Sequence, residues 1–120
     1  MTNKRRFHRI RLSAQATVHY LDNDYEGILG AISLGGASIN FNDSAMIPHG
    51  DHCSVSVVLD KNQPALRFDA KITNSSFYRI GVAFINMDDD TAMKLYSRLK
   101  ELTSEPEKLT SEMQLFIAIH

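Results

Sequence analysis

The sequence predicts a mainly β fold, an antiparallel barrel or sandwich, that is followed by helices. Apolar and polar residues alternate at period two in several short segments between residues 13 and 87. Clusters of turn-forming residues separate these segments. After Met87 the apolar residues recur at helical spacing instead. Short strands joined by tight turns favour a closed or layered antiparallel sheet, so the order is β first and then α.

Six strands are expected, and each follows from its alternation and from the turn residues around it. They fall within residues 14–21, 25–33, 35–41, 53–59, 65–76 and 78–87. In the third segment Ala37, Ile39 and Phe41 share one face. Three glycines inside the segments predict bulges or sharp bends of a small sheet: Gly27, Gly30 and Gly81.

Two helices are expected after the strands. Apolar residues at helical spacing mark the first: Met93, Tyr96, Leu99 and Leu102. Residues 88–90 are aspartates, which cap a helix N-terminus and complement its dipole. The second helix has Pro106 in its first turn and an apolar face of Met113, Phe116, Ile117 and Ile119.

The size and composition indicate one globular domain in three regions. The chain has 120 residues, 43% of them hydrophobic. We expect a flexible basic arm over residues 1–12, a barrel over 13–87 and a helical region over 88–120. No apolar run is long enough to cross a membrane, and no apolar segment follows the basic N-terminus as in a secretory signal. The lone Cys53 excludes an internal disulfide and favours a cytoplasmic location.

Positive charge is concentrated near the N-terminus. Residues 4–11 (KRRFHRIR) hold five of the 13 Lys and Arg residues, and no acidic residue precedes Asp22. The net charge of -1 therefore combines a basic arm with an acidic body. Two interpretations remain open: the arm binds an anionic ligand, or it folds back onto the protein's own acidic surface.

Catalytic and metal sites find little support in the sequence. His49, His52 and Cys53 lie close together, but no second cluster completes a four-ligand site. No nucleophile, zinc-protease or phosphate-loop motif occurs. We therefore expect neither an enzyme nor a bound metal or cofactor.

The arm and a later glycine pair are better candidates for a binding site. Arg5 and Arg9 are four residues apart, and arginine binds phosphate through a planar pair of donors and stacks on bases. Phe7 and Ile10 would anchor such a strap. Ser33 and Gly36 lie between two expected strands, where an ordinary hairpin turn and a close approach to a ligand are both possible.

Alternatives for the arm are a disordered tail and a nucleic-acid-binding segment. The rest of the chain is acidic and lacks the aromatic platform of an RNA-binding sheet. These features favour a compact phosphorylated purine over a long polyanion.

In combination, these features resemble the PilZ domain family over essentially the whole chain. The arm Arg5-Arg6-Phe7-His8-Arg9 matches the family's RxxxR motif. The segment Ala31-Ile32-Ser33-Leu34-Gly35-Gly36 matches its D/N-x-S-x-x-G motif, and residues 79–84 (RIGVAF) match a late barrel strand.

The resemblance implies a six-stranded barrel and a receptor for cyclic di-GMP that acts on a downstream protein partner in motility or biofilm control. By this resemblance Arg5 and Arg9 contact phosphates and guanine faces, with Arg6 adding a contact. Ser33 hydrogen-bonds to the ligand, while Gly35 and Gly36 complete the turn and leave room for the base. Lys4 is at a position where a basic residue accompanies binding of two stacked ligands. We expect no membrane insertion and do not favour nucleic acid as a partner.

One position departs from the family motif. The family's Asp or Asn is Ala31 here, so one side chain that reads a guanine edge is missing. Losing such a contact costs about 0.5–1.5 kcal/mol of binding free energy. The alternative function is therefore a PilZ-like protein-interaction adaptor that no longer binds the ligand.

Overall fold

The computed structural model describes residues 9–119, and side chains through residue 114. It contains six strands and two helices: β1 (Ile10–Tyr20), β2 (Asn23–Ile32), β3 (Gly36–Asn40), β4 (His52–Val57), β5 (Leu66–Ser75), β6 (Arg79–Asn86), α1 (Asp89–Leu102) and α2 (Pro106–Ile119).

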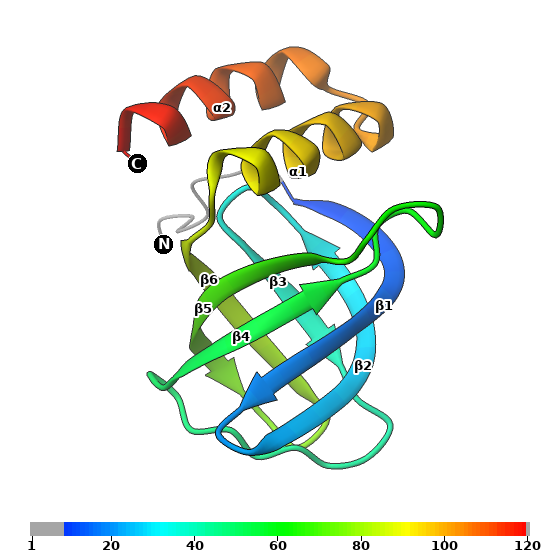
Figure 1. Ribbon diagram of the computed structural model, residues 1–120, viewed down its shortest axis with the longest axis vertical. Coiled ribbons are helices and arrows are strands. Elements are labelled where there is room, and N and C mark those ends of the chain that lie inside the picture. The colour runs from blue at the N-terminus through cyan, green and yellow to red at the C-terminus, as the bar shows by residue number, and fades with distance from the viewer. Residues whose placement is uncertain (1–8, 120) are drawn as a thin grey trace, which may run out of the picture.

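The strands form a closed antiparallel barrel in the order β1-β2-β3-β6-β5-β4 (Figure 1). Strand β1 closes it by pairing with β2 on one side and with β4 on the other, so that Val18 lies opposite both Tyr25 and Val55. This confirms the expected fold class and selects a barrel over a sandwich.

Alternate residues of every strand fill the barrel. Val18, Leu29 and Ile39 are completely or almost completely buried, as their period-two spacing predicts. On the neighbouring strands β5 and β6, the rings of Phe68 and Phe84 stack with centroids 4.3 Å apart. The core is therefore continuous from β1 round to β6.

The glycines within strands have different roles. Gly30 lies at a register shift between β2 and β3, as expected for a bulge. Gly81 lies opposite Asn74, next to a shift in β5. No shift occurs at Gly27, where a Cβ atom would approach the backbone oxygen of Asn40 to 2.4 Å. Gly27 therefore permits close strand approach.

The barrel begins earlier than the expected boundary at residue 13. Ile10 is buried and pairs with Ile32, so β1 already includes residues 10–12. Burial of the Ile10 side chain favours the strand over an arm at this position.

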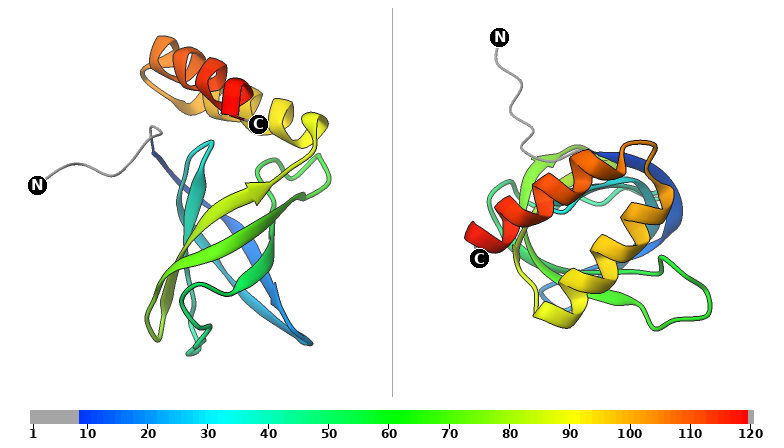
Figure 2. Two further views of the ribbon diagram at one scale, coloured as in Figure 1. Left: turned by 90° about the vertical axis from the view of Figure 1, so that its left-hand side faces the viewer. Right: turned by 90° about the horizontal axis from the view of Figure 1, so that it is seen from above.

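The two helices cross one end of the barrel (Figure 2). Asp88 caps α1 by accepting a hydrogen bond from the Thr91 N–H at 2.7 Å, as its sequence position predicts. The buried face of α1 consists of Ala92, Leu95 and Leu99. Of the expected residues, Leu99 is buried and Tyr96 is partly buried, whereas Met93 and Leu102 are exposed.

The opposite end of the barrel, which we call the distal end, carries three connections. They are the β1–β2 turn, the long β3–β4 loop and the β5–β6 turn (Figure 1). The helix end instead holds the start of β1, the β2–β3 turn and the β4–β5 loop. In the part of the chain that the structure describes, neither helix is long and apolar enough to span a bilayer.

Candidate functional site

The last residue of the RxxxR motif, Arg9, and the β2–β3 turn both lie at the helix end of the barrel. Strand β1 begins immediately after Arg9, and Ile10 pairs with Ile32, which directly precedes the β2–β3 turn. Arg9 is exposed. The start of β1 therefore places the end of the RxxxR motif beside residues 33–36. Lys4, Arg5 and Arg6 lie outside the described residues.

Ser33 organises the β2–β3 turn. Its Oγ accepts hydrogen bonds from the N–H groups of Gly35 at 3.1 Å and Gly36 at 3.2 Å. Its backbone N–H donates to the Gly36 oxygen at 2.8 Å, and its side chain donates to the same oxygen at 3.4 Å. The residue is only 5% exposed. Ser33 therefore fixes the shape of the turn from inside.

The two glycines of the turn contact β6. The Gly35 oxygen accepts a hydrogen bond from the Phe84 N–H at 2.8 Å. A Cβ atom on Gly36 would approach the Val82 oxygen to 2.2 Å, which no side chain can accommodate without movement of the strand. Glycine at position 36 is therefore required by the β3–β6 contact, whether or not a ligand is present.

Ala31 lies in a row of paired residues across three strands, in which Arg11 is exposed and Ser38 is buried. It pairs with Arg11 on β1 and with Ser38 on β3. Since directly opposed residues share a face, the exposed Arg11 projects from the same face as Ala31. Sequence reasoning did not identify Arg11 as a site residue, because only the β1–β2 register connects it with position 31.

A hollow lies beside the first half of β1 and the β4–β5 loop. Its volume is about 600 Å³. It is lined by Leu12, Ser13, Ala14, Gln15, Ile28, Val58, Leu59, Asp60, Lys61, Asn62 and Arg98. Arg98 already binds Glu101 at 3.2 Å and the Leu59 oxygen at 3.2 Å. Lys61 is an exposed cation among the residues that line this hollow.

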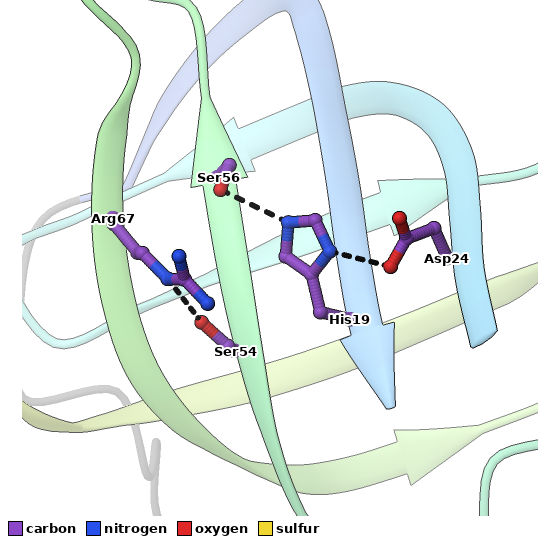
Figure 3. A network of polar contacts seen from close by, with 5 residues as sticks. All are labelled: His19, Asp24, Ser54, Ser56 and Arg67. Atoms are coloured by element: carbon purple, nitrogen blue, oxygen red, sulfur yellow. Dashed lines mark hydrogen bonds and ion pairs between the residues drawn. The ribbon is translucent and has the colours of Figure 1, made fainter. Parts of the chain in front are cut away.

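A polar network on the barrel wall superficially resembles a catalytic triad (Figure 3). His19 Nδ1 lies 2.6 Å from Asp24 Oδ1, and Nε2 lies 3.2 Å from Ser56 Oγ. However, Ser56 is in the middle of β4, paired with Thr17 of β1 and Arg67 of β5. The strand backbone is used in these pairings, so it does not offer the free N–H donors that an oxyanion requires.

The same network extends to β5. Arg67 Nε donates to Ser54 Oγ at 2.9 Å, and Ser54 is directly opposite His19. These side chains form hydrogen bonds with one another on the outer face of four neighbouring strands (Figure 3). We interpret the network as cross-strand stabilisation of the barrel wall.

The histidine and cysteine residues considered as metal ligands do not converge. Among the described residues, no group of three His, Cys, Asp or Glu side chains could hold a metal ion. His52 and Cys53 are neighbours on β4 and point to opposite faces, so His52 is exposed and Cys53 is buried. Burial raises the pKa of the Cys53 thiol to about 11, which leaves it protonated and weakly nucleophilic at neutral pH.

Known structures share this fold. The PilZ domain of YcgR from Escherichia coli, solved with c-di-GMP, has a TM-score of 0.68 and 18% identity, covering 81% of this chain and 88% of that one. A longer YcgR structure with c-di-GMP has a TM-score of 0.70 and 20% identity, covering 91% and 50%. The Bacillus subtilis inhibitor of motility MotI/DgrA has a TM-score of 0.65 and 12% identity, covering 78% and 48%.

This chain thus spans about half the length of MotI/DgrA and of the longer YcgR structure. At these identities the likeness shows the shared fold. No curated protein sequence matches the chain. The sequence itself matches the PilZ domain over residues 3–103, which include both motifs and all six strands. The chain therefore belongs to the PilZ domain family.

Proposed function

We propose that this protein is a non-catalytic receptor for cyclic di-GMP. The observation that carries the proposal is the position of Arg9, which immediately precedes β1 and thus adjoins the β2–β3 turn in a PilZ barrel. Two structurally similar PilZ proteins were solved with c-di-GMP. A basic segment beside a preformed turn suits a compact ligand with two phosphates.

In this proposal the ligand is held between the arm and the barrel. Arg5, Arg6 and Arg9 bind phosphates and stack on guanine, and Lys4 favours a second stacked ligand. The ligand rests on the turn formed by Ser33, Gly35 and Gly36. Ser33 contributes mainly by holding the turn in shape, because its hydroxyl already bonds to three backbone groups.

Arg11 compensates for the missing acidic or amide side chain at position 31. Arg11 is exposed and pairs with Ala31 across β1 and β2, so the two residues share a face of the sheet. Arginine donates readily to the O6 and N7 acceptors of guanine, which lie on the Hoogsteen edge, next to the edge that carries the N1 and N2 donors. Guanine is thereby recognised through a different edge from the one that an aspartate would bind.

Ligand binding orders the arm across the helix end and changes the surface offered to a downstream protein partner in the cytoplasm. This is an order–disorder switch driven by the higher affinity of the ligand for the closed arm. Motility or biofilm control is the output that the family resemblance implies.

Isothermal titration calorimetry with cyclic di-GMP tests the proposal. We expect the wild type to bind and Arg5→Ala/Arg9→Ala to lose at least about tenfold in affinity, since each charge-assisted contact contributes about 1.5–3 kcal/mol. Arg11→Ala should also weaken binding. Arg79→Ala, which removes an exposed cation from the far end of the barrel, is the matched control and should bind like the wild type. No heat from the wild type at ligand concentrations on the order of 10 μM would disprove the receptor function.

The departure from the family motif at Ala31 favours a second candidate function. In this alternative the protein is an adaptor that does not bind the ligand and acts through protein contacts alone. Ala31→Asp restores the motif and distinguishes the two functions. Binding by Ala31→Asp that the wild type lacks would favour the adaptor. Binding by the wild type itself would remove the reason for proposing it.

A further inference from the structure

The distal end of the barrel exposes a cluster of large apolar side chains. Met46 in the β3–β4 loop is 59% exposed, and Phe77 and Tyr78 in the β5–β6 turn are 61% and 58% exposed. The Phe77 and Tyr78 rings are neighbours, with centroids 6.5 Å apart. We call Met46, Phe77 and Tyr78 the aromatic tip.

The aromatic tip is held in place by its backbone. The Ala45 N–H donates to the Phe77 oxygen at 2.8 Å, and the Phe41 N–H donates to the Tyr78 oxygen at 2.8 Å. Ala45 and Ile47 on either side of Met46 are buried. The loop and the turn therefore form one preorganised surface, which reduces the entropic cost of binding a partner.

The end of the barrel that carries the aromatic tip has an excess of acidic residues. The three connections at the distal end, together with the two strand residues on either side of each, contain four aspartates and one arginine: Asp22, Asp24, Asp43, Asp51 and Arg79. Asp22 and Asp43 form no ion pair within residues 9–119. A partner for this surface should therefore combine positive charge with apolar groups. Arginine suits it best, because guanidinium groups pair with carboxylates and stack on aromatic rings.

The chain contains a segment of this composition. Residues 4–8 are Lys-Arg-Arg-Phe-His, and they carry no acidic group. The segment cannot reach the aromatic tip of its own barrel. Arg5 is five residues before Ile10, which allows at most about 18 Å of extended chain. Strand β1 has 11 residues and extends for roughly 33 Å from the helix end towards the distal end (Figure 1).

We propose that the aromatic tip of one molecule binds residues 4–8 of a second molecule. Arg5 and Arg6 pair with the distal aspartates and stack on Phe77 and Tyr78, while Phe7 packs beside Met46. The contact joins different surfaces of the two copies, so each added molecule leaves one arm and one tip available. Such a heterologous contact produces open, concentration-dependent chains or rings. It also gives a role to the acidic charge of the barrel, which the nucleotide site does not use.

Sedimentation velocity of the full chain at low and high ionic strength tests this proposal. At low ionic strength the wild type should assemble beyond a dimer as its concentration rises, and salt should reverse the assembly. Phe77→Ser/Tyr78→Ser should weaken self-association by about tenfold or more, as expected for loss of central aromatic anchors. Arg5→Glu/Arg6→Glu should have the same effect. Met93→Ser removes a similarly exposed side chain (50% exposed) from α1 and should assemble like the wild type.

Mixing the two defective variants gives the decisive measurement. The Phe77→Ser/Tyr78→Ser protein retains an intact arm, and the Arg5→Glu/Arg6→Glu protein retains an intact tip. Together they should form a 1:1 complex that does not grow further. A monomeric wild type at low ionic strength overturns the proposal, as does a mixture that fails to associate. Association that the tip variant leaves unchanged overturns it as well, because the arm then binds elsewhere. Circular dichroism checks that each variant is folded.

Discussion

At the scale of single residues, burial determines what the polar side chains can do. Ser33 has the position of a ligand-binding residue in the family motif, yet its hydroxyl bonds to the backbone of its own turn. Cys53 lies beside two histidines in the sequence, yet it points into the core. In both cases the strand or turn geometry, and not the residue type, sets the chemistry.

The buried Cys53 predicts an alkaline loss of stability. Its thiol has a pKa of about 11 in the folded protein because burial disfavours the thiolate. As the pH rises above about 9, the thiol loses its proton in the unfolded chain but keeps it in the folded protein. The free energy of unfolding therefore falls until the pH exceeds the pKa of the folded thiol. Between pH ~8 and ~10, urea denaturation should show the wild type losing about 1.4 kcal/mol more than Cys53→Ala. Equal losses would show that the folded thiol titrates normally.

At the scale of secondary structure elements, the contact between β3 and β6 supports the candidate site. Gly36 opens β3 and lies opposite Ala83, with the Val82 oxygen in the space that a side chain would need. The turn that precedes Gly36 is also bonded to β6 through Gly35 and Phe84. The shape of the β2–β3 turn therefore depends on β6, although 46 residues separate Gly36 from Val82 in the sequence.

Substitution of one glycine on each of the two strands tests this dependence. Gly36→Ala should lower the unfolding free energy by more than about 3 kcal/mol, because a backbone atom must move away from the new Cβ. Gly81→Ala is the matched control on the partner strand, where the nearest atoms would be 3.4 Å away. It should cost far less in the same urea denaturation series. Similar losses of unfolding free energy for both variants would mean that β6 does not approach position 36 closely enough to exclude a side chain.

The elements themselves were largely predictable, but their mutual register was not. Alternation in the sequence identified six strands, because each has one face in the core and one face in solvent. It could not show that Arg11 lies beside Ala31, which depends on a bulge in β1 between Arg11 and Ala14. It identified Leu99 on the buried face of α1, but it missed Ala92 and Leu95 and included the exposed Met93 and Leu102. Apolar spacing alone does not specify which side of the helix meets the barrel end and α2.

At the scale of the whole molecule, the two ends of the barrel have complementary chemistry. The helix end holds the start of β1, preceded by the basic segment, and the β2–β3 turn (Figure 1). The distal end holds the aromatic tip and four aspartates. The -1 net charge of the chain conceals this separation. If the arm binds the ligand in its own molecule and the tip in another, the two interactions compete for Arg5 and Arg6.

Competition predicts that cyclic di-GMP dissolves the assemblies. The ligand should lower the weight-average sedimentation coefficient of the wild type at low ionic strength towards that of the monomer. By linkage, assembly should weaken ligand binding by the same factor, so the affinity measured by calorimetry should fall as the protein concentration rises. Phe77→Ser/Tyr78→Ser retains the nucleotide site but not the tip, so its ligand affinity should be independent of protein concentration. Assemblies that bind the ligand and keep their size would contradict competition, because they would show that the same arginines are not needed for both contacts.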